Sequence, residues 1–293
     1  MVYYMDMNRQ KQSGFAHVGL ILIAVVVLAA IGFATWKVFG GNKDAKDDTP
    51  SQVGTPTEDE TKDDTQPMEL IWQQAENGWR STQTPPACPD QPMMKMPADI
   101  NKVTGILYPG QTRGGNYKPH GGFRFDGTAN DKVQVTAPVD GFIVRGGSYL
   151  AEGEVQYTFD IMHNCGVMYR VGHFRVLPDN LQKLADTWPA PQENDSRTQI
   201  VNPAVYVKKG EVLATSVGIV KDKNTFFDWG VYDYRQQNTA SQSSAYQQAH
   251  AQDKELSWHA VCWFDWLPAS DSTKVKSLPA GDPTSGKKSD YCN

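Results

Sequence analysis

The hydrophobic pattern begins with one long apolar run near the N-terminus. Val18–Trp36 reads VGLILIAVVVLAAIGFATW, without a charged residue, and Lys37 ends the run. At a helical rise of about 1.5 Å per residue, a run of this length crosses a hydrocarbon core of about 30 Å. The pattern therefore predicts a transmembrane helix at 18–36, after a short cytoplasmic N-terminus at 1–17.

The charges around this run and the region after it favour an outward orientation. Arg9 and Lys11 precede the run, which places the N-terminus in the cytoplasm, although Asp6 and Lys37 weaken the bias. The stronger argument is the polar region that follows, because it carries all four cysteines. A cleaved secretory signal would have a shorter apolar part, of about 7–15 residues. We therefore expect a single-pass plasma-membrane protein whose domain is extracytoplasmic.

Residues 37–67 are polar and acidic. Residues 41–67 contain eight carboxylates and three lysines, a net charge of −5, which equals the net charge of the whole chain. Such a segment buries too little apolar surface to offset the entropy of ordering, so we predict a disordered acidic tether. The rest of the chain is neutral overall and offers no basic surface, so we expect no nucleic-acid partner.

Alternating apolar and polar residues dominate 103–235. In 154–163, Val155, Tyr157, Phe159 and Ile161 recur at every second position, which predicts a strand with one buried face. Similar segments, separated by glycine-containing turns, lie at 103–108, 122–126, 133–137, 142–145, 167–174, 205–207, 211–214 and 226–234. Only 178–188 is typical of a helix. We predict a mostly β domain with an antiparallel, sandwich-like core, in which 205–207 and 211–214 form a hairpin.

The segment at 68–102 precedes this domain. Leu70, Ile71, Gln74 and Trp79 lie at helical spacing, which predicts a short helix within 68–81. Three prolines then interrupt regular structure. We expect this segment to pack on the β domain.

The C-terminal extension, 236–293, is marked by the aromatic sequence WHAVCWFDWL at 258–267. One interpretation is an apolar clamp that packs the tail onto the domain and is held by a disulfide. The other is a platform of flat aromatic faces that stack on sugar rings. Residues 269–293 look flexible, although Cys292 suggests that the end is tied down.

The four cysteines are candidates for disulfides. None of them forms a Cys-x-x-Cys pair, which argues against a zinc knuckle or a thioredoxin motif. An even number of cysteines on the outer side of a membrane permits two disulfides, in any of three pairings. The candidates are Cys88, Cys165, Cys262 and Cys292.

Four segments of the β domain carry motifs whose order along the chain matches that of a known family. They are the sequence HGGF at 120–123, VQVTAPVDGFIV at 133–144, IMHNCGVMYRVGH at 161–173 and VKKGEVLA at 207–214. Together they resemble the lysostaphin-type, or LytM-like, zinc endopeptidases of bacterial cell walls, also called duplicated hybrid motif domains. The resemblance covers about 105–235 and implies a lysostaphin-type fold.

The resemblance also implies a metal site, which this chain keeps only in part. The family holds zinc with a His-x-x-x-Asp motif and the second histidine of a His-x-His motif, and leaves one position open for a reactive water. His120 matches the first ligand, but Arg124 stands where the aspartate is expected. Phe226 and Asp228 replace the two histidines of His-x-His. A zinc site would therefore need His120, Asp228 and a third group such as Asp126.

Two further histidines match family positions in the third segment. His173 matches the catalytic histidine of the family, and His163 matches its other histidine. Both also suit a structural, hydrogen-bonded role. Arg124 can pair with Asp228, with Asp126 or with a ligand carboxylate, because a guanidinium forms forked contacts with carboxylates. The expected cleft residues are His120, Arg124, His163, His173 and Asp228.

Three functions follow from these features. The first is a membrane-anchored envelope protein with a degenerate endopeptidase domain, which binds peptidoglycan or an envelope partner without cutting and needs no cofactor. The second is an active zinc endopeptidase that cleaves peptidoglycan cross-links with altered ligands, with His173 as its catalytic histidine. The third is a pilus-like envelope component, because Gly14-Phe15 before the apolar run resembles a prepilin processing site. That family expects Glu where this chain has Gly19.

Overall fold

The computed structural model describes residues 69–76 and 78–292. The chain divides into two units, 1–63 and 64–293, and the described residues belong to the second. The predicted membrane helix at 18–36, the tether and the Gly14-Phe15 junction lie outside the described residues. Within 69–76 and 78–292, no helix is both long and apolar enough to cross a membrane.

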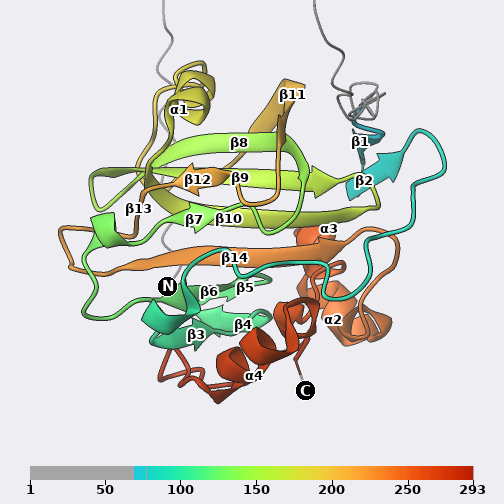
Figure 1. Ribbon diagram of the computed structural model, residues 1–293. Helices are drawn as coiled ribbons and strands as arrows, with labels where there is room; N and C mark the ends of the chain where they lie inside the picture. The colour runs from blue at the N-terminus through green and yellow to red at the C-terminus, as the bar shows by residue number, and fades with distance from the viewer. Residues whose placement is uncertain (1–68, 77, 293) are drawn as a thin grey trace, which may run out of the picture. The chain divides into compact units, whose positions relative to one another are not determined.

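The described part is mostly β and its sheets are antiparallel, which confirms the predicted class at this level (Figure 1). One large sheet has the strand order β11-β8-β9-β10-β14-β6-β3, with β13 beside β10. Three two-stranded sheets pair β1 with β2, β4 with β5, and β7 with β12. The strands are β1 (Trp72–Ala75), β2 (Gly78–Ser81), β3 (Gly105–Leu107), β4 (Gln111–Arg113), β5 (Asn116–Lys118), β6 (Gly121–Arg124), β7 (Val135–Thr136), β8 (Gly141–Ala151), β9 (Glu154–His163), β10 (Val167–Val176), β11 (Gln199–Val207), β12 (Val212–Ala214), β13 (Ser216–Val217) and β14 (Phe226–Asp233).

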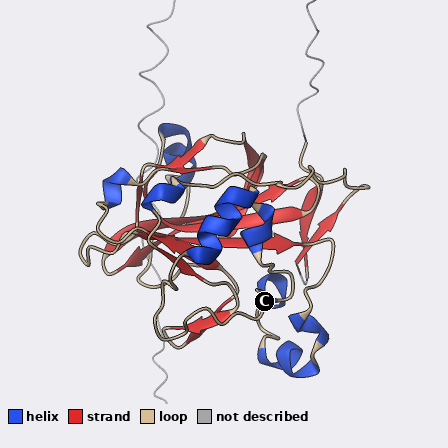
Figure 2. Ribbon diagram, turned by 60° about the horizontal axis from the view of Figure 1, so that its bottom comes forward, coloured by secondary structure: helices blue, strands red, loops and turns tan. Residues whose placement is uncertain are grey.

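Helices surround the strand layer (Figure 2). They are α1 (Asp179–Ala185), α2 (Ser244–Ala249), α3 (Lys254–Ser257) and α4 (Ala269–Ser277), with 3₁₀ turns at Ile100–Lys102, Asn130–Lys132, Ala240–Gln242 and Trp263–Trp266. Only α1 was expected from the sequence. The helices α2 and α3 are six and four residues long, too short to produce a readable helical period.

Alternation along the strands directs one set of side chains of the large sheet into the main core. Phe159 and Ile161 on β9 and Phe227 and Trp229 on β14 have no exposed surface. They share one core cluster with apolar residues of β7, β12 and α1. Because successive side chains of a strand point to opposite faces, Asp228 points to the other face of the sheet.

The hairpin predicted for 205–214 does not form. β11 pairs with β8, whereas β12 pairs with β7, so the two segments belong to different sheets. Lys208, Lys209 and Gly210 carry the chain between them. Gly210 has a φ of +86°, and the amide of Lys209 donates to Asp140. The turn signal was correct, but a turn between two strands does not require that they pair with each other.

The helix predicted within 68–81 is also wrong. Residues 72–75 and 78–81 form the antiparallel pair β1–β2, with Trp72 opposite Ser81. Trp72 and Trp79 are both buried in a satellite cluster on the sheet. Trp72 also donates from Nε1 to the backbone oxygen of Asn164 at 2.8 Å. These long-range contacts override a helical spacing carried by only a few residues.

The C-terminal extension packs as the first interpretation of its aromatic sequence expects. Trp263 and Phe264 are 0% and 2% exposed, so their faces are not open to sugar rings. The segment expected to be flexible instead forms α4 and then a strap at 279–292. In the strap, Ala280 bridges in parallel to Ile106, and Gly281 donates to the oxygen of Ile106 at 2.7 Å. The strap therefore covers the edge strand β3.

Candidate functional site

His120 lies directly before β6, which runs between β3 and β14 with close backbone contacts to both. A side chain at Gly121 would put its Cβ 2.2 Å from the backbone oxygen of Leu107, and one at Gly122 would come within 2.6 Å of the oxygen of Phe227. Only glycine fits at these two positions, which explains the residues that follow His120. The backbone oxygen of His120 accepts from Nη2 of Arg113 at 2.9 Å, which fixes the chain at this point.

Asp228 lies at the centre of the site on β14. It faces Gly122 of β6 on one side and Gly172 of β10 on the other. Cross-strand neighbours on one face of a sheet are normally in side-chain contact, so two glycines leave space around this carboxylate. The imidazole rings of His120 and His173 reach this carboxylate from positions outside the regular ladder.

His173 reaches this space through a distortion of β10. Its φ is +61°, in the left-handed region that residues other than glycine adopt only uncommonly. The pairing of β10 with β9 shifts register between Val171 and Phe174, so His173 sits at a bulge. Bulges redirect side chains, and such backbone strain persists only where the surrounding structure enforces it. The strained backbone makes the position of His173 a candidate for a functional site.

The three side chains converge on one carboxylate oxygen. Oδ2 of Asp228 lies 3.3 Å from Nε2 of His120 and 3.6 Å from Nε2 of His173. The side chains of His120, His173 and Asp228 are 14%, 18% and 22% exposed, so the cluster can be reached from solvent. The structure thus brings together three of the five expected cleft residues.

Two neighbours orient His173. The hydroxyl of Tyr149 lies 3.3 Å from Nδ1 of His173, and the ring of Phe226 lies 4.4 Å from the imidazole, centroid to centroid. Burial raises the pKa of Tyr149, so its hydroxyl stays protonated and can donate to Nδ1. Nε2–H then faces the carboxylate of Asp228. A hydrogen bond at one ring nitrogen of a histidine sets which of the two nitrogens carries the proton, and the contact with Tyr149 has this role at His173.

The protonation states follow from burial and charge together. Burial lowers the pKa of His120 and of His173, and the nearby Asp228 carboxylate only partly opposes it. Burial would raise the pKa of Asp228, but the positive charge available on His120, His173 and Arg113 outweighs it and holds that pKa below its usual range. At neutral pH the site therefore presents a carboxylate between two neutral imidazoles.

Arg124 and Asp126 are engaged with each other at the edge of this face. Nη2 of Arg124 lies 2.6 Å from Oδ1 of Asp126, and Thr104 donates to Oδ2 at 3.1 Å. The hydrogen bond from Arg124 lowers the pKa of Asp126. A Cβ on Gly281 of the strap would lie 2.8 Å from Cδ of Arg124, so the strap packs against this arginine. Of the two protein carboxylates considered for Arg124, the structure pairs it with Asp126 and not with Asp228.

The described residues do not fit the zinc that the family resemblance implies. Arg124 occupies the position of the second ligand, and the carboxylate of Asp126 is committed to Arg124 and Thr104. Across 69–76 and 78–292, no group of three His, Cys, Asp or Glu side chains is arranged to hold a metal ion. His120 and Asp228 are adjacent, but Asp126 does not complete the set with them.

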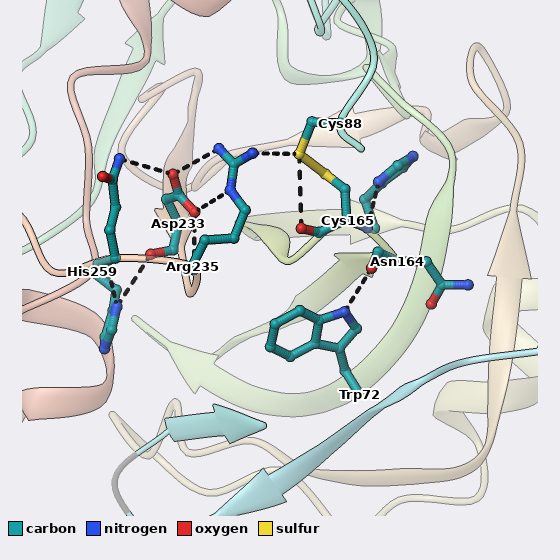
Figure 3. Close-up of polar contacts among 9 residues, drawn as sticks. Trp72, Cys88, Asn164, Cys165, Asp233, Arg235 and His259 are labelled. Atoms are coloured by element: carbon teal, nitrogen blue, oxygen red, sulfur yellow. Dashed lines mark hydrogen bonds and ion pairs between the residues drawn. A yellow bond between two sulfur atoms is a disulfide. The ribbon is translucent and has the colours of Figure 1, made fainter. Parts of the chain in front are cut away.

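His163 lies away from the cluster, at the end of β9. Its Nδ1 accepts from the amide of Cys165 at 3.0 Å, and its backbone oxygen accepts from Gly166 at 2.9 Å. Burial lowers its pKa. These contacts shape the turn between β9 and β10. The Cys88–Cys165 disulfide, labelled in Figure 3, lies next to this turn. His163 has a structural role in this turn.

All four cysteines form disulfides, which confirms that prediction. Cys88 pairs with Cys165, and Cys262 pairs with Cys292. The first joins 69–102 to the turn after β9, and the second joins the end of the strap to the aromatic sequence of the C-terminal extension.

Sequence reasoning did not find Arg113 or Tyr149. Arg113 holds the backbone of His120 and also donates from Nη1 to the oxygen of Tyr108 at 2.6 Å. Tyr149 is 6% exposed and comes from the far end of β8. Neither residue belongs to a motif. Arg113 comes from the neighbouring β4–β5 pair, whereas Tyr149 is brought to the site by the pairing of β8, β9 and β10.

Comparison with known proteins adds little to this geometry. No protein-family model matches the chain, and no curated protein matches it. Among solved structures, that of Helicobacter pylori Csd3 aligns with a TM-score of 0.30 and 10% sequence identity. The alignment covers 56% of this chain and 37% of Csd3, so the chain spans little more than a third of that protein. At this level the similarity assigns neither a family nor a function.

Proposed function

We propose that this chain is a membrane-anchored protein of the cell envelope, whose degenerate lysostaphin-type domain binds peptidoglycan peptides without cutting them. Val18–Trp36 anchors it in the plasma membrane, and the domain lies outside the cytoplasm. The two disulfides support this location, because disulfides persist in oxidising compartments. The binding site is the cluster of His120, Asp228 and His173.

The observation that carries the proposal is the selective change at the site. Three side chains at matching motif positions converge, and two of them, His120 and His173, are kept as histidines. The position of the second metal ligand has become Arg124, and Asp126 neutralises this arginine. A site that keeps two histidines but has an arginine in place of a metal ligand suits binding better than metal-assisted hydrolysis.

The cluster has the chemistry to hold a peptide. At neutral pH its carboxylate accepts hydrogen bonds from amide N–H or ammonium groups, and its neutral imidazoles can donate or accept. The adjacent ring of Phe226 offers an apolar wall beside His173. These groups are partly exposed, so binding requires no opening of the core.

Sedimentation with purified peptidoglycan tests this function. The full chain is mixed with peptidoglycan, and the bound fraction is compared with that of Asp228→Asn and of the control Asp126→Asn. Asp126 is a neighbouring carboxylate that lies outside the cluster. We expect binding that falls at least tenfold in Asp228→Asn, the loss of about one charge-assisted hydrogen bond, and stays unchanged in Asp126→Asn. Equal binding by all three proteins would refute the assignment of the site.

Metal content separates binding from the alternative of an active zinc endopeptidase. The full chain is purified without chelator, and zinc is measured in the wild type and in His120→Ala. We expect no stoichiometric zinc in either protein. About one zinc per chain that is lost in His120→Ala would overturn the proposal and direct the work to peptidoglycan cleavage assays.

A further inference from the structure

The Cys88–Cys165 disulfide has an arginine against one of its sulfur atoms. Nη1 of Arg235 lies 3.0 Å from Sγ of Cys88, as Figure 3 shows. Cys88 is half-buried, whereas Cys165 has no exposed surface. The two sulfurs therefore differ both in access and in electrostatic environment.

Arg235 is held firmly in this position by a buried carboxylate. Its Nε and Nη2 donate to the two oxygens of Asp233, each at 2.8 Å, and Asp233 is 1% exposed. Those hydrogen bonds raise the pKa of Arg235, so the guanidinium remains charged. The fork uses two of the three nitrogens, and the third, Nη1, is directed at Cys88.

The buried sulfur is held by the turn after β9. The amide of Cys165 donates to His163, and Tyr234 donates to the oxygen of Gly166 at 2.9 Å. Trp72 donates to the backbone oxygen of Asn164 beside it. These hydrogen bonds do not involve the sulfur atoms, so they can hold the turn in place when the S–S bond is broken.

A cation beside a cysteine favours the thiolate over the thiol, and thiolates are both the nucleophiles and the better leaving groups of disulfide exchange. We propose that Cys88–Cys165 is an exchange-active disulfide, in which external thiols attack Cys88 and Arg235 stabilises the thiolate that Cys88 becomes. The co-reactant is a dithiol reductant. Exchange would remove the covalent link between Cys88 and the turn between β9 and β10, while the hydrogen bond of Trp72 to Asn164 remains.

The reaction proceeds in two balanced steps. In the first, one thiolate of the reductant attacks Sγ of Cys88, the S–S bond breaks, and its electron pair passes to Cys165, which takes a proton from water. In the second, the remaining thiolate of the reductant attacks the reductant sulfur that is bonded to Cys88. Cys88 then leaves as the thiolate beside Arg235. The protein disulfide gains two electrons, and the dithiol is oxidised to a disulfide.

The second disulfide provides a control within the same molecule. Cys262 and Cys292 are both half-buried, like Cys88. Within 69–76 and 78–292, no arginine or lysine donates a hydrogen bond to either sulfur, in contrast to Arg235 at Cys88. An effect of Arg235 should therefore be confined to Cys88–Cys165.

A redox titration of the folded full chain tests the inference. The protein is equilibrated with mixtures of reduced and oxidised dithiothreitol, thiols are trapped with iodoacetamide, and each disulfide is followed by peptide mass spectrometry. We expect Arg235→Gln to require about tenfold more reductant for half-reduction of Cys88–Cys165, the effect of a tenfold loss of thiolate. Cys262–Cys292 should keep its midpoint.

The matched control is Arg197→Gln. Arg197 also forms a fork with an aspartate two residues before it, Asp195, but donates to no cysteine sulfur within 69–76 and 78–292. It should leave both midpoints unchanged. An Arg235→Gln midpoint equal to that of the wild type, or an equal shift of both disulfides, would overturn the inference.

A second measurement serves if Arg235→Gln does not fold. In the reduced wild type at pH 6, Cys88 should react with iodoacetamide about tenfold faster than Cys292, because more of it is thiolate. Equal rates would overturn the inference. Peptidoglycan binding is measured separately and depends on Asp228, so failure of one proposal leaves the other intact.

Discussion

Asp160 anchors the part of the large sheet next to the candidate site, and its replacement should be severely destabilising. Its side chain has no exposed surface, and it accepts from Nε of Arg145 at 2.8 Å and from Nε and Nη2 of Arg170 at 2.6 and 2.8 Å. Arg145 continues the network to Glu255 of α3. Asp160→Asn keeps the shape but removes the charge and turns an amide N–H toward arginine donors.

The magnitude follows from burial. Breaking a buried ion pair by removing one partner costs about 3–5 kcal/mol, because the other charge stays buried without compensation. Burial would raise the pKa of Asp160, but the two arginines outweigh it and lower that pKa, so the charged form is the native one. At about 1.4 kcal/mol per factor of ten, the folded-to-unfolded ratio should fall by about 10² to 10⁴.

Urea unfolding followed by tryptophan fluorescence measures this change at neutral pH with the disulfides intact. The matched control is Asp195→Asn, which removes a similar forked contact with Arg197 at the surface. We expect no measurable change in the control, since solvent screens such pairs. A loss below about 1 kcal/mol in Asp160→Asn, or equal losses in both variants, would refute the reasoning from burial.

Three further outcomes are expected. Burial raises the pKa of Asp253 to about 6 from its ordinary value of 3.8, so the folded state holds this proton more tightly than the unfolded state. The free energy of unfolding should therefore fall as pH rises from about 4 to about 6 and then level off, and Asp253→Asn should flatten that slope in urea titrations. Trp263→Ala should cost about 3–5 kcal/mol, because Trp263 is fully buried and its ring lies 4.9 Å from that of Phe123; a thermal melt unchanged from the wild type would contradict this. At His173, the φ of +61° suits glycine and opposes β-branched residues, so His173→Val should be less stable than His173→Gly by about 1–3 kcal/mol, whereas both should lose peptidoglycan binding. Equal stability of the two variants would show that the position is not strained.

Part of the candidate site could be predicted from the sequence. His120 and His173 stand at motif positions of the family that the sequence resembles, and Asp228 stands where that family has a histidine of His-x-His. The partner of Arg124 was left open among three carboxylates, because a long side chain can reach in several directions. Its choice of Asp126 depends on Thr104 and on the strap, which come from distant parts of the chain.

By itself, the sequence determined the features that depend on local pattern. Period-two alternation identified most of the strands between 103 and 235, although not β4, β5 or β13, and it gave the antiparallel β class. The helix predicted at 178–188 is α1. The apolar run at 18–36 and the acidic tether remain predictions of the same kind. Such features are local because the hydrophobic period and the turn residues act over a few positions.

Only the tertiary structure decided which segments meet. It assigned β11 and β12 to different sheets, replaced a predicted helix by β1–β2, and chose one disulfide pairing among three. It also bent β10 at His173 and set Arg235 against Cys88. These outcomes rest on contacts between residues far apart in the chain, whose energies outweigh local preferences and leave no periodic trace in the sequence.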